Sequence, residues 1–330
     1  MIRVPREAIS NHSAAQEAAE ECLHSGGTAV DAVLAAYFAL AGATPWGMLA
    51  PLTILVAGSG SGVRVIDGRA RQPGLGIERP VRYTNEGAAP LLARAAAPTT
   101  AAAVSVASSR FGHESLPQLA ALGARIARNQ GAHQRAALIS RFGDARALIL
   151  QDRTFLAEVA EHVPRFEGAL LQPADLAIKG ADVLPCQPSC TLAGIQAAFP
   201  PWYDPSSTRT AAPGARPPFH LLVLASERGN LAALLLRQPE KVIPLFDGEV
   251  ELPAVGQPAL RGVPRLRPGT PLPLAAPMAV LWKGMRVTHM LGSIGEGPIL
   301  EEEVTALLNS EGPSGLTLRA GTLLAVCCQA

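Results

Sequence analysis

One stretch of the sequence, residues 32–43, is apolar at nearly every position. Thr28 stands before it with Asp31 three residues later, which is the spacing of a capping box, so a helix is predicted to begin here. A helix that is apolar on all sides has no face for water and must lie between other layers. The stretch is 12 residues long, short of the roughly 20 that span a membrane, and Pro45 and Pro51 interrupt the chain just after it. We therefore predict a buried core helix.

Amphipathic segments surround this core helix. Apolar spacing predicts further helices at residues 14–23, 116–128, 155–162 and 300–308. Strand patterns around short Gly-containing turns predict hairpins at residues 52–57 with 63–66, 220–225 with 231–236, 279–282 with 285–291, and 316–318 with 322–326. Residues 185–218 are rich in Pro, Ser, Thr and Gly and are predicted to form an exposed loop. Helices at the front and hairpins at the back predict an α/β (α+β) layered sandwich with antiparallel sheets and one shared core.

Composition limits the partners and the compartment. The chain of 330 residues has 28 Lys and Arg against 27 Asp and Glu, a net charge of +1, which gives no electrostatic case for binding nucleic acid or a membrane surface. Only 4% of its residues are aromatic within a hydrophobic fraction of 48%, so the core must be mostly Ala, Leu and Val. Five cysteines, an odd number, suggest no disulfide framework and favour a reducing compartment. No apolar leader follows the charges of residues 1–17, so a cytoplasmic location is expected.

Motifs for metal and cofactor binding are weak. Cys186 and Cys190 have the spacing C-x3-C, but no second pair of Cys or His supplies the further ligands of a metal site. Cys327 and Cys328 are adjacent on a strand pattern, so their side chains point to opposite faces. The Gly-rich run 58–62 lacks the residues that complete a phosphate-binding loop. We therefore expect no metal and no cofactor.

Six segments of the sequence resemble one protein family when they are taken together. They are Gly-Gly-Thr-Ala-Val-Asp-Ala at 26–32, Val-Ile-Asp-Gly-Arg at 65–69, Leu-Leu-Gln-Pro-Ala-Asp-Leu-Ala at 170–177, the hairpin at 220–235, Pro-Gly at 268–269 with Ala-Pro at 276–277, and Gly-Ser-Ile-Gly at 292–295. In this order they resemble the gamma-glutamyltransferase (gamma-glutamyltranspeptidase) family of the N-terminal-nucleophile hydrolase superfamily. The first segment is the most specific, and this sequence is much shorter than is usual for the family.

The resemblance implies a fold, a division of the chain and a chemistry. The implied fold is a four-layer αββα sandwich in which residues 1–330 form one domain. Residues 1–212 resemble a shortened large subunit of the family, and residues 213–330 resemble its small subunit. In that family the precursor cleaves itself just before a Thr, whose hydroxyl attacks the gamma-glutamyl amide while its freed α-amine acts as the base.

This sequence departs from the family at the nucleophile. Aligning His220 with the His that follows the family's two Thr residues places Pro218 at the nucleophile and Phe219 at the next Thr. A shifted alignment does not restore the hydroxyl, because residues 211–225 contain no Ser, Thr or Cys. Thr210 lies eight residues before the expected position, up to roughly 26 Å of extended chain. The sequence therefore predicts loss of self-cleavage and of the family's catalysis.

The binding positions of the family are partly retained. By the resemblance, Arg69, Ser293 and Gly295 are expected to bind the substrate, with Arg69 pairing with its carboxylate. The Ser pair expected near this site is replaced by Leu and Ala at 274–275, which donate no side-chain hydrogen bond. Glu296 stands where a second Gly would complete an oxyanion hole, and its carboxylate would oppose a developing negative charge.

These departures predict a degenerate relative of the family, a pseudoenzyme that remains one uncleaved chain. It would hold a small amino-acid-like carboxylate ligand near Arg69, or serve as a regulatory or structural subunit in a homo-oligomer or beside an active homologue. An assembly protein with no ligand is a further hypothesis. The alternative is an active amidohydrolase or gamma-glutamyl or acyl transferase with a relocated nucleophile, for which the candidates are Cys190, Thr191, Thr208 and Thr210.

Overall fold

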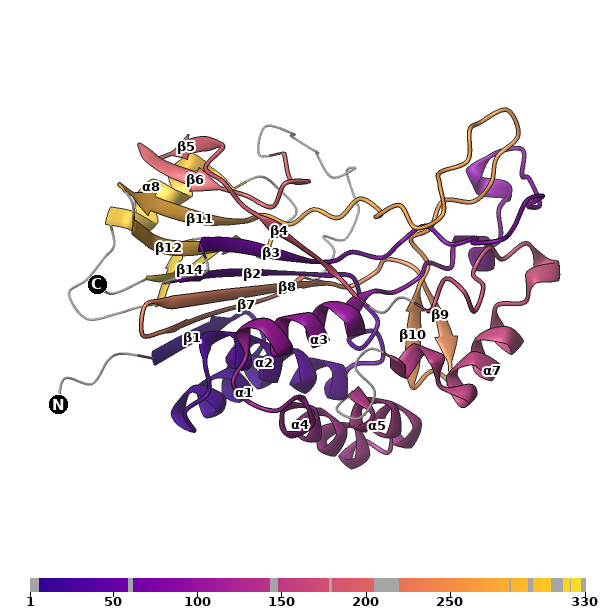
Figure 1. Cartoon of the computed structure of the whole chain (residues 1–330), viewed down its shortest axis with the longest axis horizontal. Coiled ribbons are helices and arrows are strands. Elements are labelled where there is room, and N and C mark those ends of the chain that lie inside the picture. The colour runs from indigo at the N-terminus through magenta and orange to yellow at the C-terminus, as the bar shows by residue number, and fades with distance from the viewer. Residues whose placement is uncertain are drawn as a thin grey trace.

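A computed structural model of the chain describes residues 6–58, 62–142, 148–177, 180–204, 220–284, 286–295, 299–309, 317–320 and 322–327. Two six-stranded sheets face each other. Within each sheet, all neighbouring strands are antiparallel. Helices cover the outer face of each sheet (Figure 1). The predicted four-layer order of helix, sheet, sheet and helix is confirmed.

Five helices lie on the outer side of the first sheet. They are α1 (Ser13–His24), α2 (Ala29–Ala43), α3 (Thr100–Phe111), α4 (Leu116–Asn129) and α5 (His133–Ser140). Helices α1, α2 and α3 pack against the sheet, and α4 and α5 pack on α2. The predicted capping box begins α2, because the Thr28 hydroxyl accepts from the Asp31 N–H at 3.2 Å and the Asp31 carboxylate accepts from the Thr28 N–H at 2.9 Å. All of α2 except Ala43 is buried. Within the described ranges, no helix is both long enough and apolar enough to cross a membrane.

The close packing of α2 against α4 depends on glycine. A Cβ atom added at Gly42 of α2 would lie 2.2 Å from the carbonyl oxygen of Gly123 in α4, and one added at Gly123 would lie 2.3 Å from the carbonyl oxygen of Phe38. The two helix backbones therefore touch. This contact is one reason why a core with few aromatic residues can still be filled.

The first sheet has the strand order β1-β7-β8-β2-β3-β4. Its strands are β1 (Arg6–Ser10), β7 (His220–Glu227), β8 (Asn230–Arg237), β2 (Leu52–Gly58), β3 (Gly62–Gly68) and β4 (Asp182–Pro185). Arg228 and Gly229 join β7 to β8 with φ angles of 47° and 81°, which is the two-residue turn that matches strand twist. Because the turn is so short, both strands extend further than the sequence predicted.

The second sheet has the order β13-β14-β12-β11-β6-β5. Its strands are β13 (Thr317–Ala320), β14 (Leu323–Cys327), β12 (Arg286–Ser293), β11 (Met278–Lys283), β6 (Ile195–Ala198) and β5 (Cys190–Leu192). The prediction of an exposed loop over 185–218 is wrong for β5 and β6. A turn at Ala193 and Gly194, with φ angles of 49° and 76°, lets these short strands pair, and β6 then pairs with β11.

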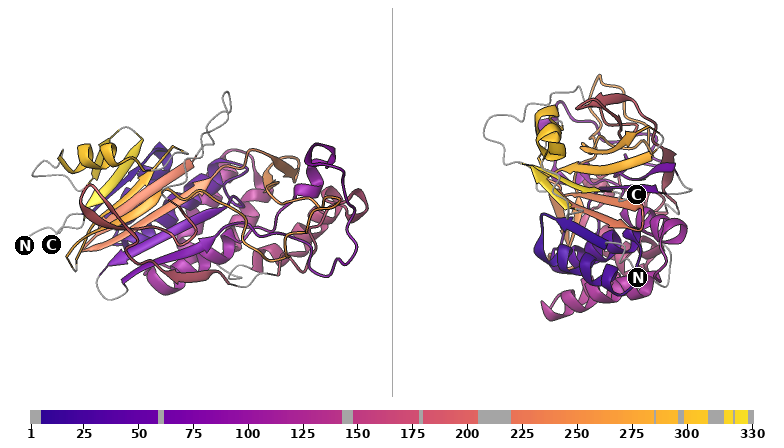
Figure 2. Two further views of the ribbon diagram at one scale, coloured as in Figure 1. Left: turned by 90° about the horizontal axis from the view of Figure 1, so that it is seen from above. Right: turned by 90° about the vertical axis from the view of Figure 1, so that its left-hand side faces the viewer.

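Helix α8 (Glu301–Asn309) covers the outer face of the second sheet. Its buried residues Val304 and Leu307 belong to one apolar cluster with Leu281 of β11 and Leu291 of β12. Figure 2 shows this helix on the side of the second sheet opposite to the first helical layer. The helix predicted at 300–308 therefore supplies the fourth layer.

Beyond one end of the sheets lies a region that is mostly loops (Figure 1). Residues 71–98, 164–177 and 254–275 make up this region, which we call the loop lobe. Its regular elements, with those beside it, are η1 (Glu86–Ala88), η2 (Leu91–Arg94), η3 (Leu148–Gln151), η4 (Arg165–Glu167), α7 (Arg153–His162), β9 (Val242–Leu245) and β10 (Val250–Pro253). The Tyr83 N–H donates to the Ala259 carbonyl and the Arg261 N–H donates to the Tyr83 carbonyl, both at 2.9 Å, which ties two of the three segments together.

Candidate functional site

Several ends of strands meet at one edge of the first sheet. Strand β7 begins there at His220, opposite Arg237 at the end of β8, and β3 ends at Gly68, opposite Leu52 at the start of β2. The segment that the family resemblance aligns with the nucleophile leads directly into β7. This edge is therefore the candidate functional site.

Polar side chains replace apolar ones on the inner face of the sheet at this edge. Leu222 and Leu224 of β7 belong to the core between the two sheets, so alternation places the His220 side chain on the same face. The same argument places Thr53 of β2 and Asp67 of β3 on that face, and these two residues are paired across the strands. His220, Thr53 and Asp67 are each at most 1% exposed. At this edge, the apolar core between the two sheets therefore ends at three buried polar side chains of the first sheet.

Arg69, the predicted carboxylate-binding residue, has an acidic partner within the chain. Its Nε and one terminal nitrogen donate to the two carboxylate oxygens of Asp67 at 2.9 and 2.8 Å. Its guanidinium carbon lies 4.0 Å from the centre of the Trp202 ring, a cation–π contact. The Arg69 side chain is 13% exposed. A ligand carboxylate at Arg69 would share the guanidinium with Asp67.

His220 is confirmed as the first residue of its strand, and its imidazole is buried. Neither ring nitrogen has a hydrogen-bond partner among the residues that the structure describes. Burial, followed by the positive charge of Arg237, lowers the pKa of His220 to about 4, so the ring is neutral at pH 7. The side chain of Asn11 accepts from the Leu222 N–H at 2.9 Å and donates to the His220 carbonyl, which fixes the start of β7.

A cavity of about 290 Å³ adjoins the same edge. Arg94, Arg237 and Lys241 contribute basic groups to its lining, and Glu240 contributes the one carboxylate. The remaining lining residues are Pro51, Ala70, Pro239, Ala254, Val255, Leu272, Pro273 and Leu274. An excess of positive charge beside apolar walls suits an anion that carries an apolar part. No motif in the sequence indicated this cavity, because its lining residues come from six separate segments.

Ser293 and Gly295 lie at the end of β12, and their polar groups contact each other. The Gly295 N–H donates to the Ser293 hydroxyl at 3.1 Å, and that hydroxyl lies 3.2 Å from the hydroxyl of Thr322. Thr322 in turn donates to the Glu303 carboxylate of α8 at 3.2 Å. Ser293 shares its face of β12 with Leu291, which packs in the outer cluster beneath α8. The expected substrate-binding hydroxyl is therefore directed toward the outer helix.

The predicted nucleophile positions Pro218 and Phe219 lie outside the described residues, as do Thr208, Thr210 and Glu296. The other candidates for a relocated nucleophile, Cys190 and Thr191, lie on β5 at the edge of the second sheet. Burial raises the pKa of the Cys190 thiol, which disfavours the thiolate that a nucleophile needs. No disulfide bond joins the described cysteines Cys22, Cys186, Cys190 and Cys327 to one another.

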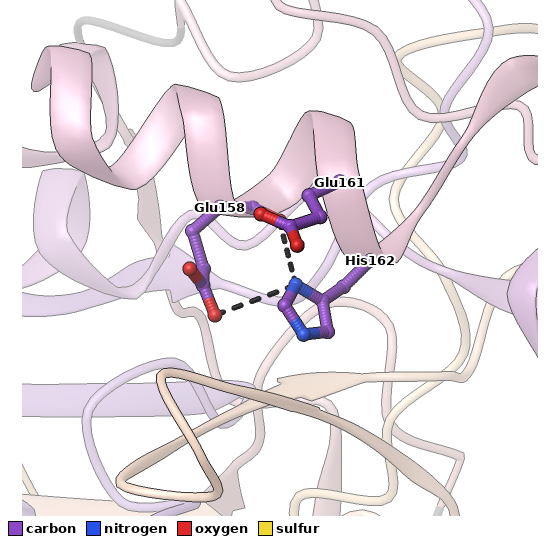
Figure 3. A group of neighbouring side chains, drawn as sticks. All are labelled: Glu158, Glu161 and His162. Carbon is purple, nitrogen blue, oxygen red and sulfur yellow. Dashed lines mark hydrogen bonds and ion pairs between the residues drawn. The ribbon is translucent and has the colours of Figure 1, made fainter.

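One cluster that the sequence analysis missed has the donor atoms of a metal site. Glu158, Glu161 and His162 point to the same side of α7, with potential ligand atoms within 4.8 Å of one another (Figure 3). Spacings of three and four along a helix could have revealed it. The Glu158 carboxylate also accepts from the Phe246 N–H in the turn between β9 and β10. Glu158 therefore holds that turn, and all three side chains of the cluster come from one helix.

No model of a protein family and no curated protein matches this chain. Solved structures do match it. LmbA2991HD aligns with a TM-score of 0.65 and 15% identity over 94% of this chain and 82% of that one. Cephalosporin acylase from Bacillus halodurans aligns with a TM-score of 0.62 and 13% identity over 87% and 77%. Gamma-glutamyltranspeptidase from Helicobacter pylori aligns with a TM-score of 0.47 and 17% identity over 58% and 68%. At such identities the first two matches establish the fold, and the chain has the αββα sandwich of the N-terminal-nucleophile hydrolases.

Proposed function

We propose that this chain is a non-catalytic protein with the N-terminal-nucleophile hydrolase fold, which binds a small carboxylate-containing ligand and is not cleaved. The observation that carries the proposal is the sequence that enters β7. Residues 211–225 contain no Ser, Thr or Cys, and β7 begins with His220. Catalysis by this fold needs a hydroxyl or thiol that becomes the new N-terminus at this strand. His220 has neither a hydroxyl nor a thiol, so the first residue of the strand supplies no such nucleophile.

The cavity beside the strand ends supports the ligand part of the proposal. Arg94, Arg237 and Lys241 outnumber the single carboxylate in its lining, which favours an anion. Leu272 and Leu274 offer an apolar wall. The amino-acid-like ligand expected near Arg69 therefore binds in this cavity, which Ala70, the residue after Arg69, helps to line. The carboxylate of the ligand faces Arg237.

Mass spectrometry under denaturing conditions tests the non-catalytic part. We expect one species at the mass of the full chain, 34.3 kDa, and no release of product from gamma-glutamyl-p-nitroanilide. Two fragments that meet near residue 218, or steady release of p-nitroaniline, would overturn the proposal. Fragments that begin at Cys190, Thr191, Thr208 or Thr210 would instead support a relocated nucleophile at that residue, and its replacement by Ala would then test the assignment.

Thermal unfolding with L-glutamate tests the ligand part. A ligand present at about 100 times its dissociation constant stabilises the folded state by roughly 2.7 kcal/mol. The Arg237→Gln variant should lose most of this stabilisation. Arg110→Gln is the matched control, because Arg110 is exposed on α3. A glutamate effect that is absent, or equal in both variants, would refute the assigned site, and copurification from the native host would then test the role as a subunit.

A further inference from the structure

The charges of this nearly neutral chain are unevenly distributed. The loop lobe, residues 71–98, 164–177 and 254–275, contains eight Arg, no Lys and four Asp or Glu, a balance of +4. Because the whole chain has a net charge of +1, the remainder carries −3. The low net charge is therefore the sum of a basic loop lobe and a mildly acidic remainder of the chain.

Most of the arginines in the lobe are not used to hold it together. Arg71 pairs with Asp182 at 2.8 Å, Arg94 pairs with Glu86 at 3.5 Å, and Arg265 donates to the carbonyl oxygens of Ile77 and Gly74. The other five are exposed and make no ion pair within the described part of the chain: Arg79, Arg82, Arg165, Arg261 and Arg267. Arginine is enriched at protein interfaces, and its planar group binds carboxylates with two hydrogen bonds.

A groove of about 440 Å³ lies among these arginines. Its floor and walls are apolar, its two charged residues are Arg79 and Arg165, and no Asp or Glu is among the residues that line it. The apolar lining consists of Ile77, Pro80, Val81, Gly168, Ala169 and Leu170. The Val81 side chain is 51% exposed. An apolar groove between two cations fits an apolar side chain that has carboxylates beside it.

Exposed apolar side chains extend the surface beyond the groove. Of the six large hydrophobic residues that are exposed in the described part of the chain, five lie in the loop lobe: Leu75, Val81, Leu91, Val255 and Val263. Contiguous exposed apolar residues with charges around them mark interaction sites. Five exposed apolar side chains in one lobe suit a polypeptide better than a single small molecule.

We propose that the loop lobe docks an acidic segment of a partner protein, in which an apolar side chain enters the groove and neighbouring Asp or Glu residues pair with Arg79 and Arg165. A second copy of this chain fits less well. The lobe would have to meet the acidic body of the next molecule, and a contact between two different surfaces continues into a ring or a filament. The groove is separate from the ligand cavity at the sheet edge, because the two share no lining residue. Val255, at the margin of the lobe, also lines the ligand cavity.

Fluorescence anisotropy with a labelled peptide of Glu-Asp-Leu repeats tests the docking surface. The double variant Arg79→Gln/Arg165→Gln should bind roughly fivefold to tenfold more weakly, as expected for the loss of two solvent-facing charge pairs. Val81→Asp should also weaken binding, because it places a carboxylate in the groove. The matched control is Arg125→Gln/Arg128→Gln, which removes the same charge from exposed positions on α4 and should bind as the unchanged chain does.

Two comparisons decide whether recognition is specific. Replacing Leu by Ser throughout the peptide should weaken binding, because the groove then has no apolar occupant. Three outcomes would overturn the proposal and leave only attraction between opposite charges. They are a Ser peptide that binds as tightly as the Leu peptide, a control variant that loses as much affinity as the double variant, and a short DNA duplex that binds as tightly as the Leu peptide. Circular dichroism of each variant confirms that a loss of binding does not reflect unfolding.

Discussion

The Arg69 guanidinium donates two hydrogen bonds to the carboxylate of Asp67, two residues earlier in the chain, and lies against the ring of Trp202. Asp67 lies in β3 and Arg69 follows the last residue of that strand, Gly68, so the pair is local in sequence. The Asp67 side chain is 2% exposed, and its charge is balanced by Arg69 at 2.8 Å and, at the longer distance of 3.9 Å, by Arg71. The pair holds the predicted ligand-binding arginine in a fixed position.

Replacing Asp67 should therefore destabilise the chain and free Arg69. Asp67→Asn leaves a largely buried guanidinium without its counter-charge, and we expect a loss of about 3–5 kcal/mol in the free energy of unfolding. Urea unfolding measures the loss. Asp182→Asn is the control, because the Asp182 side chain is 60% exposed and its pairing with Arg71 should contribute less than about 1 kcal/mol. Similar losses in both variants would contradict the importance of the buried pair.

The buried imidazole of His220 predicts a pH dependence of stability. Its pKa is about 4 in the folded chain and about 6.5 in an unfolded one. Between these pH values the unfolded chain binds more protons at His220 than the folded chain does. The contribution of His220 to the free energy of unfolding is therefore constant above about pH 6.5 and falls as the pH decreases toward 4. The expected loss is about 3 kcal/mol.

Urea unfolding at a series of pH values measures this effect. His220→Phe should remove most of the decrease between pH 6.5 and 4. The control is His113→Gln, since the His113 side chain is exposed, and it should keep the decrease. If the decrease persists unchanged in His220→Phe, another group is responsible.

The contact between α2 and α4 should not tolerate a methyl group. Gly42→Ala places a Cβ where the carbonyl of Gly123 now lies, so the helices must separate. We expect a loss of about 1–3 kcal/mol or more, as for other overpacked cores. Gly180→Ala is the control, because a Cβ there meets no atom within 4 Å. Thermal unfolding of both variants measures the difference, and a neutral Gly42→Ala would show that the helices move apart without cost.

Elements defined by local signals could be predicted from the sequence. The capping box of Thr28 and Asp31 and the apolar run after it predicted α2, and short Gly-containing turns predicted the hairpins. Strands β5 and β6 were missed because each is short and the surrounding segment is rich in Pro and Ser. Their pairing depends on β11, which is distant in sequence, so no local pattern encodes it.

The candidate site was only partly predictable for the same reason. The position of Arg69 at the end of a strand could be predicted, and the closeness of Asp67 in sequence could also have identified it as the partner of Arg69. The contact with Trp202 could not, since it forms only when the chain after β6 returns to the first sheet. The direction of the Ser293 side chain likewise depends on α8 and Thr322, which come later in the chain.

The strand order of the first sheet has a consequence for any break between Asp204 and His220. Strands β7 and β8 lie between β1 and β2, so the piece after such a break would stay inserted in the piece before it, held by hydrogen bonds to two flanking strands. The pieces would remain together as a split protein and separate only when unfolded. The same interleaving makes this interval a favourable place for new termini in a circular permutant, provided the original ends are joined by a linker.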